Sequence, residues 1–240
     1  MAIKNYDNKL STANNLQVIF EDNHLLVVNK RPGDIVQGDN TGDKPLSEVA
    51  KEYIAAKYNK PGAVYLGVVH RLDRPTSGVV IFARTSKALT RLNKLFAERN
   101  TQKVYWAIVK NTPKKHNDRL IHFLKRNPKQ NKSYAHIKEV PDSKKAILSY
   151  QLIKKLDNYS LLEIHLETGR HHQIRSQLST IGSPIKGDLK YGFDRSNKDG
   201  SIHLHAKKMT LVHPVLKEKI TFIAPPPQDV IWNLCQTTQD

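Results

Sequence analysis

The chain has 240 residues, enough for one sizeable hydrophobic core, and its 39 Lys and Arg residues against 22 Asp and Glu residues give a formal net charge of +17. This surplus favours a polyanionic partner such as nucleic acid, although a basic protein kept soluble by charge, or one that touches anionic lipid, would share it. The single cysteine, Cys235, excludes an internal disulfide and a cysteine-based metal cluster, and no apolar run approaches the roughly 20 residues that cross a bilayer.

The first half of the chain mixes strand and helix patterns. Residues 1–15 are polar and rich in asparagine, without a signal-like apolar segment, so we expect a flexible N-terminal segment in a cytoplasmic protein. The patterns that follow predict strands at 16–20 and 25–28, a surface helix over 45–58, and a second helix over 86–99. Thr85 or Ser86 is available as the N-cap of the second helix.

Strands dominate the second half of the chain. They are predicted over 103–109, 133–139, 146–156, 159–166, 204–212 and 220–223. Asp157 and Asn158 suit a tight hairpin turn, and a helix is predicted to begin after Gly169. The polar, lysine-rich segment 112–132 is expected to be a solvated loop, with an insertion that grips RNA as the alternative. Together these patterns predict one α+β domain over residues 16–240, with a mixed, largely antiparallel sheet flanked by helices.

The segment from His70 to Gly78 holds one carboxylate, Asp73, between Arg71 and Arg74. Apolar strand patterns lie on both sides of it, so the motif is predicted to be a loop at a strand end, where chemistry is often placed. Nearby cations favour the ionised carboxylate, which would be ready to act as a nucleophile or a base. A structural ion pair is the alternative reading of the same three residues.

A second motif lies on the strand predicted over 103–109. Alternation places Lys103, Tyr105 and Ala107 on one face of this strand, and the other face packs in the core. Tyr105 would then face a cleft, where its ring could stack on a base and its hydroxyl could move a proton. A tyrosine packed at the edge of the sheet is the alternative.

A third motif runs from Glu167 to Arg175. Gly169 permits a turn, and the N-terminus of the helix after it favours an anion. His171 and Arg175 would lie four residues apart on one side of that helix. Arg175 could reach back to pair with Asp73, or Arg170 and Arg175 could hold a phosphate, and a solvated helix face is the alternative for both.

Together these three segments resemble the RluA-type pseudouridine synthases, which carry an HRLD-x-x-TSG loop, a K-x-Y-x-A strand and a TGR-x-HQIR helix in this order. The resemblance extends through residues 182–192 and 204–207 and spans about residues 16–224. It implies the pseudouridine synthase fold and an isomerase that converts uridine in ribosomal or transfer RNA to pseudouridine. The N1–C1′ bond of the uridine is broken, the uracil rotates, and it is rejoined through C5. No metal or organic cofactor is implied, and we expect a monomer.

The resemblance also implies roles for single residues. Asp73 would be the catalytic carboxylate, Tyr105 the ring beside the target base, and Arg175 the ionic partner of Asp73. Arg71 would fill the space that the flipped nucleotide leaves. The remaining expected substrate contacts are His70, Thr76, Lys103, Arg170 and His171.

Some positions depart from the family pattern. The turn Lys30-Arg31-Pro32-Gly33 shifts the usual proline, and Gln177 and Ser183 stand where many members have histidine. We expect these departures to affect the choice of substrate and not the type of reaction. The small S4-type RNA-binding domain of many relatives is also not expected ahead of residue 16.

Two other functions compete with this reading. A metal-dependent phosphoesterase could draw imidazoles from His171, His172, His203 and His205 and carboxylates from Asp73 and Asp188. Neighbouring histidines on a helix point in different directions, which makes a shared site poor. A non-catalytic RNA-binding or assembly factor would explain the net charge alone.

Overall fold

The computed structural model of the protein describes residues 10–236. Residues 1–9 of the N-terminal segment, which was expected to be flexible, lie outside the described residues. In the rest of that segment Ser11 is buried, and its backbone N–H and its hydroxyl both donate to the carboxylate of Asp34, at 2.9 and 2.6 Å. The chain therefore contacts the folded domain from Ser11 onward.

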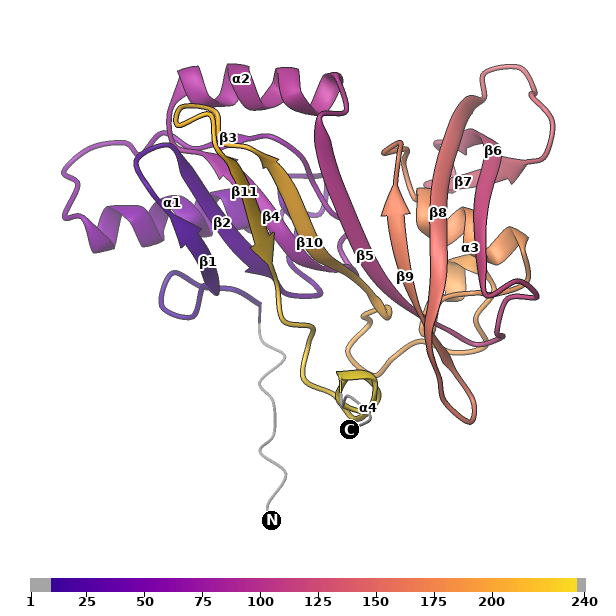
Figure 1. The fold of residues 1–240 in the computed structure, drawn as a ribbon. Helices are drawn as coiled ribbons and strands as arrows, with labels where there is room; N and C mark the ends of the chain where they lie inside the picture. The colour runs from indigo at the N-terminus through magenta and orange to yellow at the C-terminus, as the bar shows by residue number, and fades with distance from the viewer. Residues whose placement is uncertain (1–9, 237–240) are drawn as a thin grey trace, which may run out of the picture.

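Eleven described strands form one sheet that crosses the whole domain (Figure 1). In spatial order its main path runs through β1 (Val18–Glu21), β2 (Leu25–Lys30), β4 (Ser77–Ala83), β10 (Leu204–Val212), β5 (Thr101–Val109), β9 (Ser160–Leu166), β8 (Lys144–Lys155), β6 (Asn117–Asn127) and β7 (Lys132–His136). Off this path, β3 (Gly67–Val68) pairs with β4, and β11 (Lys219–Ile223) pairs with β10. Among the described strands only β4 and β10 run parallel, which confirms the predicted mixed, largely antiparallel sheet.

The parallel pair depends on a glycine. Gly78 has φ +117°, and a Cβ atom at this position would lie 2.3 Å from the backbone oxygen of Ala206 on β10. A larger residue would push the two strands apart. Gly78 thus allows β4 to join β10 directly, and the Asp73 loop enters the sheet at this junction.

Helices cover both faces of the sheet. The helices α1 (Leu46–Lys57) and α3 (Gln173–Thr180) share one apolar cluster with Phe82, Tyr105 and Ile164. On the other face, α2 (Ser86–Ala97) packs on β2 and β4, and α4 (Val230–Gln236) packs on Ile108 and Leu161. A short 3₁₀ turn, η1 (Leu189–Tyr191), follows α3. Each helix turns an apolar stripe to the sheet, as expected for a layered α+β domain.

The local signals at α2 act as predicted. The Thr85 hydroxyl accepts a hydrogen bond from the Ala88 N–H at 3.1 Å, so Thr85 is the N-cap. The β8–β9 hairpin also forms, with its turn at Asp157 and Asn158. None of the described helices is long and apolar enough to cross a membrane.

One segment differs from its prediction, and one helix was not predicted. The expected solvated loop over 112–132 is wrong, because most of it is strand β6, paired with both β7 and β8. Only alternate positions of β6, Leu120, His122 and Leu124, are buried. Charged residues at 118–119 and 125–126 flank this short run and hide the strand pattern. The C-terminal tail is helix α4, where Trp232 and Cys235 pack against the sheet.

Candidate active site

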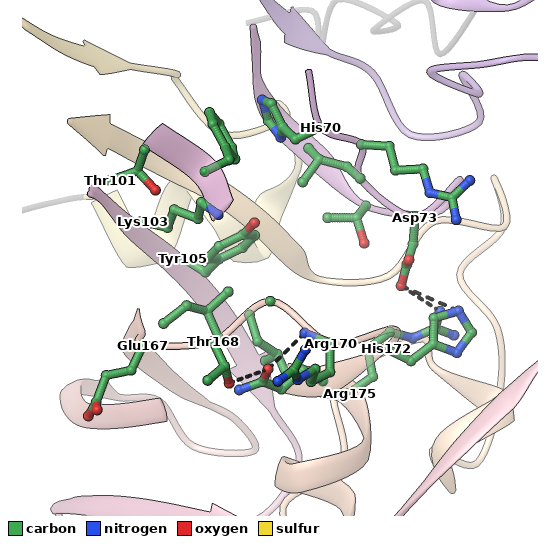
Figure 2. A pocket seen from close by; sticks show the side chains of 18 of the residues that line it. His70, Asp73, Thr101, Lys103, Tyr105, Glu167, Thr168, Arg170, His172 and Arg175 are labelled. Atoms are coloured by element: carbon green, nitrogen blue, oxygen red, sulfur yellow. Dashed lines mark hydrogen bonds and ion pairs between the residues drawn. The ribbon is translucent and has the colours of Figure 1, made fainter. Parts of the chain in front are cut away.

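A cavity of about 480 Å³ lies where the loop before β4, the N-terminal half of β5 and the loop before α3 meet (Figure 2). Asp73 comes from the first of these segments, Tyr105 from the second and Arg175 from α3, just beyond the third. All three side chains line the cavity. The structure therefore brings together the three residues for which the sequence predicted catalytic roles.

Arg175 joins two carboxylates. Its Nη1 donates to Asp73 Oδ2 at 2.9 Å, while its Nε and Nη2 donate to the two oxygens of Asp188 at 2.7 and 2.9 Å. Asp188 is only 1% exposed and Arg175 only 5%. Burial lowers the pKa of Arg175, but the two carboxylates outweigh it and raise that pKa above its ordinary value. The guanidinium is thus a permanent cation, fixed by a bidentate contact and aimed at Asp73.

The two arginines beside Asp73 in sequence are not its partners. Arg74 pairs instead with Asp43 on the surface, and Arg71 is exposed at the rim of the cavity. In the folded loop Leu72 is buried and Asp73 is half-buried, whereas Arg71 and Arg74 are exposed. The expected arrangement of Asp73 between two guanidiniums is therefore wrong. The Asp73 side chain is 28% exposed and remains accessible from the cavity.

His172 is a second neighbour of Asp73. The Tyr191 hydroxyl accepts from the Ser133 N–H at 2.8 Å, so it is left to donate to His172 Nδ1 at 3.0 Å. Burial, opposed by Asp73 and assisted by Arg175, lowers the pKa of His172 to about 3, which makes the ring neutral at pH 7. Its one proton then lies on Nε2, which is 3.5 Å from Asp73 Oδ2. This chain of contacts sets the tautomer that faces the carboxylate.

Tyr105 is 9% exposed and belongs to the apolar cluster under α1 and α3, while one side of it lines the cavity. Burial, with a smaller contribution from Asp73, raises the pKa of Tyr105 well above its ordinary value. The phenol therefore stays protonated at neutral pH, so it can donate a hydrogen bond but is a poor base. The cleft-facing orientation predicted for Tyr105 is confirmed, and its ring is the part best placed for contact.

The buried side chain of Lys30 is hydrogen-bonded to the backbone of the Asp73 loop. Its Nζ donates to the backbone oxygens of Arg31, Arg74 and Thr76 at 2.9, 3.1 and 2.7 Å, and the residue is 1% exposed. Three carbonyls match the three N–H groups of an ammonium. Burial lowers the pKa of Lys30 to about 7, and the charges of Asp34 and Asp73 act in the opposite direction. The loop that carries Asp73 is thus fixed by a buried side chain from β2.

Four of the five expected substrate contacts, His70, Thr76, Lys103 and Arg170, line the cavity. The fifth, His171, is not among the lining residues. The helix begins at Gln173, after His172 in a left-handed conformation with φ 52°, so His171 precedes it and cannot share a helix face with Arg175. The His171 ring instead contacts Ser133 Oγ at 2.9 Å and Asn131 Oδ1 at 3.1 Å.

The histidines proposed for a metal site are used elsewhere. His171 and His172 stack on each other with centroids 3.8 Å apart. His203 contacts Asp229 at 3.0 Å, and His205 contacts Ser77 at 2.9 Å. Within residues 10–236 no three His, Cys, Asp or Glu side chains are grouped as metal ligands would be. The side chains offered for a phosphoesterase thus do not converge.

Gln177, where the family pattern has histidine, packs against the sheet. It is fully buried, and its Nε2 lies 3.0 Å from His122 Nδ1 and 3.3 Å from the backbone oxygen of Leu120. Ser183 is also buried and does not line the cavity. Gln177 therefore belongs to the packing of α3 on β6, and Ser183 lies in the buried turn that follows α3.

Three residues at the site were given no role in the pseudouridine synthase reading of the sequence: His172, Asp188 and Tyr191. Asp188 and Tyr191 lie in the segment 182–192, which the family resemblance covers, and this was the available signal. His172 was set aside because adjacent histidines make a poor metal site. Its position before the helix, and not on it, brings the ring to Asp73.

The sequence of the chain is similar to those of known proteins. Residues 24–180 match the family model described as RNA pseudouridylate synthase. The chain is 34% identical over 227 residues to ribosomal large subunit pseudouridine synthase D of Zymomonas mobilis, covering 90% of this chain and 70% of that protein. It is 32% identical over 216 residues to an uncharacterized RNA pseudouridine synthase of Synechocystis, covering 88% of this chain and 66% of the relative.

Solved structures agree on the fold. The chain superposes on human RNA pseudouridylate synthase domain containing 4 with a TM-score of 0.75 at 23% identity, covering 91% of each chain. The match to human RNA pseudouridylate synthase domain containing 1 has a TM-score of 0.72 at 22% identity and covers 95% of this chain and 90% of that one. At this level of identity the similarity establishes the shared architecture. The chain spans about two thirds of the length of the curated relatives.

Proposed function

The chain belongs to the RNA pseudouridylate synthase family, and we propose that it converts uridine in structured RNA to pseudouridine with Asp73 as the catalytic carboxylate. One observation carries the assignment. Asp73 Oδ2 accepts from Arg175 at 2.9 Å, yet the Asp73 side chain stays 28% exposed in a cavity that Tyr105 also lines. A carboxylate that is oriented and still accessible can reach a nucleotide turned out of its helix.

The first step is entry of the nucleotide. A uridine stacked in RNA cannot reach Asp73, so it must leave the stack at a cost of a few kcal/mol. The Tyr105 ring offers an aromatic surface for the uracil, worth roughly 1–3 kcal/mol per base. Arg71, exposed at the cavity rim, is placed to fill the space left in the RNA.

The second step breaks the N1–C1′ bond. Asp73 either attacks C1′ or removes a proton from the ribose, and both routes use the oxygen that Arg175 orients. The uracil then rotates in the cavity and joins C1′ through C5. The C5 proton must then leave. Because burial keeps the Tyr105 hydroxyl protonated, this hydroxyl is a poor acceptor, and the proton passes to the Asp73 carboxylate, free again once C1′ is rejoined, or to water.

Further contacts hold the substrate. His70, Thr76, Lys103 and Arg170 line the cavity, and Thr76 Oγ1 is buried without a hydrogen-bond partner in the described part of the chain. Such an atom is costly unless a bound molecule pairs with it. In this proposal the Thr76 hydroxyl forms a hydrogen bond with a polar atom of the uridine. His171 supports His172 by stacking and is not assigned a direct contact.

Ribosomal RNA is the preferred substrate class in this proposal, with transfer RNA as the alternative. The Zymomonas relative is named for the large ribosomal subunit, and the formal net charge of +17 suits a phosphate-rich partner. We propose that the protein acts in the cytoplasm as a monomer. A base-specific map of pseudouridine in ribosomal and transfer RNA, with and without the protein, would identify the target position.

The catalytic assignment is tested with Asp73→Asn. We expect this variant to keep its fold and to bind RNA within a few fold of the unchanged protein, yet to form no pseudouridine. The matched control is Asp43→Asn, which removes a carboxylate from an exposed arginine pair away from the cavity and should stay active. Continued modification by the Asp73→Asn protein would contradict the role of Asp73 and favour a non-catalytic RNA-binding factor.

A further inference from the structure

The cavity continues beyond the residues that the proposed reaction uses. Past Tyr105 it is lined by the end of α2 and the start of β5, with the side chains His70, Phe96, Arg99, Thr101 and Lys103. Figure 2 shows Tyr105, Lys103 and Thr101 in sequence along β5, with Thr101 farthest from Asp73. One end of the cavity thus holds the reacting carboxylate, and the other end holds a separate group of side chains.

Lys103 is a cation without a matching anion. It is partly buried, its Nζ lies 4.5 Å from the centroid of the Phe96 ring, and no carboxylate within residues 10–236 forms an ion pair with it. The two acidic residues that line the same cavity have other partners, since Asp73 pairs with Arg175 and Glu167 with Arg119. Burial lowers the pKa of Lys103, so an anion that bound there would relieve an unfavourable charge.

His70 adds a second donor next to Lys103. Its Nε2 accepts a hydrogen bond from the Ile81 N–H at 3.0 Å, which leaves the ring proton on Nδ1. Burial, with the charge of Lys103, lowers the pKa of His70 to about 3, so the ring is neutral. The ring stacks on Phe96 with centroids 5.0 Å apart. His70 Nδ1–H has no hydrogen-bond partner in the described residues and is available to a ligand.

The spacing fits a nucleotide next to the target. Lys103 and Tyr105 lie on the same face of β5, two residues apart, which is about 6.8 Å along a strand. When a base contacts Tyr105 and its ribose faces Asp73, the adjoining phosphate must lie either on the Asp73 side of the cavity or on the Lys103 side. The Asp73 side already holds Arg175, which two carboxylates neutralise. Arg71 and Arg99 also line the cavity but are exposed, and Arg170 Nε donates to the Lys145 backbone oxygen at 3.2 Å. Lys103 is the partly buried cation of the lining that has neither an ion pair nor a hydrogen bond in the described residues.

We propose that Lys103 and His70 bind the phosphodiester that joins the target uridine to its neighbour, with Phe96 beneath them as a platform. This inference rests on the proposed function, because it takes the target uridine to lie between Asp73 and Tyr105. A phosphodiester oxygen accepts from both an ammonium and an imidazole N–H, and these contacts are charge-assisted. The carbonyl oxygens of the uracil could accept from the same two donors. The experiment below distinguishes a contact with the phosphodiester from a contact with the base.

The probes are uridine, the dinucleoside phosphate UpU, and UpU with an uncharged methylphosphonate link. Their affinities are measured by competition against a fluorescent oligouridylate. We expect UpU to bind at least about fivefold more tightly than its methylphosphonate analogue, and this ratio should fall as salt is added. A ratio near one in the unchanged protein would overturn the proposal without any variant.

Variants locate the effect. Lys103→Met should bring the ratio of UpU to methylphosphonate affinity close to one, and Lys103→Arg should retain most of it. The matched control is Lys219→Met, on an exposed lysine of β11 that does not line the cavity and should keep the full ratio. An unchanged ratio in Lys103→Met, or equal losses for uridine and UpU, would overturn the phosphate assignment, the latter in favour of a base contact.

The affinity ratio can be measured in a protein that does not form pseudouridine, so it tests the phosphate site separately from catalysis. Asp73→Asn should keep the affinity ratio of the unchanged protein, since it alters neither Lys103 nor His70. If that variant still forms pseudouridine, the proposed function fails while the ratio still reports on the phosphate site. If the ratio fails while Asp73→Asn is inactive, only the phosphate site is overturned.

Discussion

Arg175 Nη1 and Asp73 Oδ2 are 2.9 Å apart although the two residues are separated by 102 positions in the sequence. The contact joins the loop before β4 to helix α3, and the same guanidinium holds both oxygens of Asp188. The Nε and Nη2 groups of Arg175 thus fix the guanidinium to Asp188, and its Nη1 group orients Asp73. The geometry of the reacting carboxylate therefore depends on a buried ion pair whose carboxylate, Asp188, does not line the cavity.

Replacing Arg175 should affect stability as well as activity. Arg175→Met leaves Asp188 buried without a partner, and breaking such a pair costs about 3–5 kcal/mol. We expect that loss in the free energy of unfolding, measured with urea, together with loss of pseudouridine formation. The matched control is Arg119→Met, which breaks the exposed bidentate pair with Glu167 and should change stability far less. Equal losses in the two variants would contradict the central role of the Arg175–Asp188 pair.

The neutral state of His172 predicts a pH dependence of stability. The unfolded chain binds a proton at this histidine below about pH 6.5, whereas the folded site binds none until about pH 3. The unfolded state therefore holds more protons in this window, so stability rises with pH there and is lost as pH falls from 6.5 towards 3. One such histidine contributes up to about 1.4 kcal/mol per pH unit.

In the variant His172→Asn the free energy of unfolding should fall less steeply between pH 6.5 and 5 than in the unchanged protein. The difference in slope should be up to about 1.4 kcal/mol per pH unit. The difference between the variant and the unchanged protein cancels the shared contribution of carboxylates. His165→Asn, at a histidine whose side chain is 52% exposed, serves as the control and should keep the full slope. An identical slope in His172→Asn would show that this ring is protonated in the folded state.

The Tyr105 ring should matter more for binding than its hydroxyl. Tyr105→Phe keeps the aromatic surface and should bind RNA within about threefold of the unchanged protein, whereas Tyr105→Leu should lose roughly 1–3 kcal/mol of binding. Fluorescence anisotropy with a uridine-containing RNA measures both. Tyr134→Leu, on an exposed tyrosine of β7 outside the cavity, is the control. Equal weakening by Phe and Leu would assign the contact to the hydroxyl.

Arg99 should favour RNA binding at the expense of stability. It ends α2 in a left-handed conformation with φ 58°, a position that favours glycine, and it lines the cavity beside Lys103. Arg99→Gly should therefore leave stability unchanged or raise it by up to about 1 kcal/mol. It should also weaken RNA binding and reduce the slope of log affinity against log salt by about 0.7.

The control for this prediction is Asn59→Gly. Asn59 follows α1 with φ 46° and lies outside the cavity. Asparagine tolerates this conformation better than arginine, so the glycine should relieve less strain there, and it should have no effect on RNA affinity. A salt slope for Arg99→Gly that matched the Asn59→Gly slope would mean that Arg99 does not contact a phosphate.

Local patterns in the sequence were enough to predict much of the sheet and the place of the reacting loop. Strand alternation placed Tyr105 towards the cavity, and Thr85 caps α2 as predicted, because both depend on residues close together in the chain. The strand β6 was missed because it is half exposed and its short run of buried positions is flanked by charged side chains. Its pairing with β7 and β8 decided its structure.

The sequence by itself determined which residues are chemically suited to the site, since Asp73, Tyr105 and Arg175 are recognisable from their motifs. The family resemblance also implied the Arg175–Asp73 pair, which the structure contains at 2.9 Å. Only the tertiary structure decided the other contacts. It turned Arg74 to Asp43, brought His172 to Asp73, and buried Asp188 against Arg175. These pairings join distant segments of the chain, and a charged side chain takes the partner that the folded backbone brings within reach, not the nearest one in sequence.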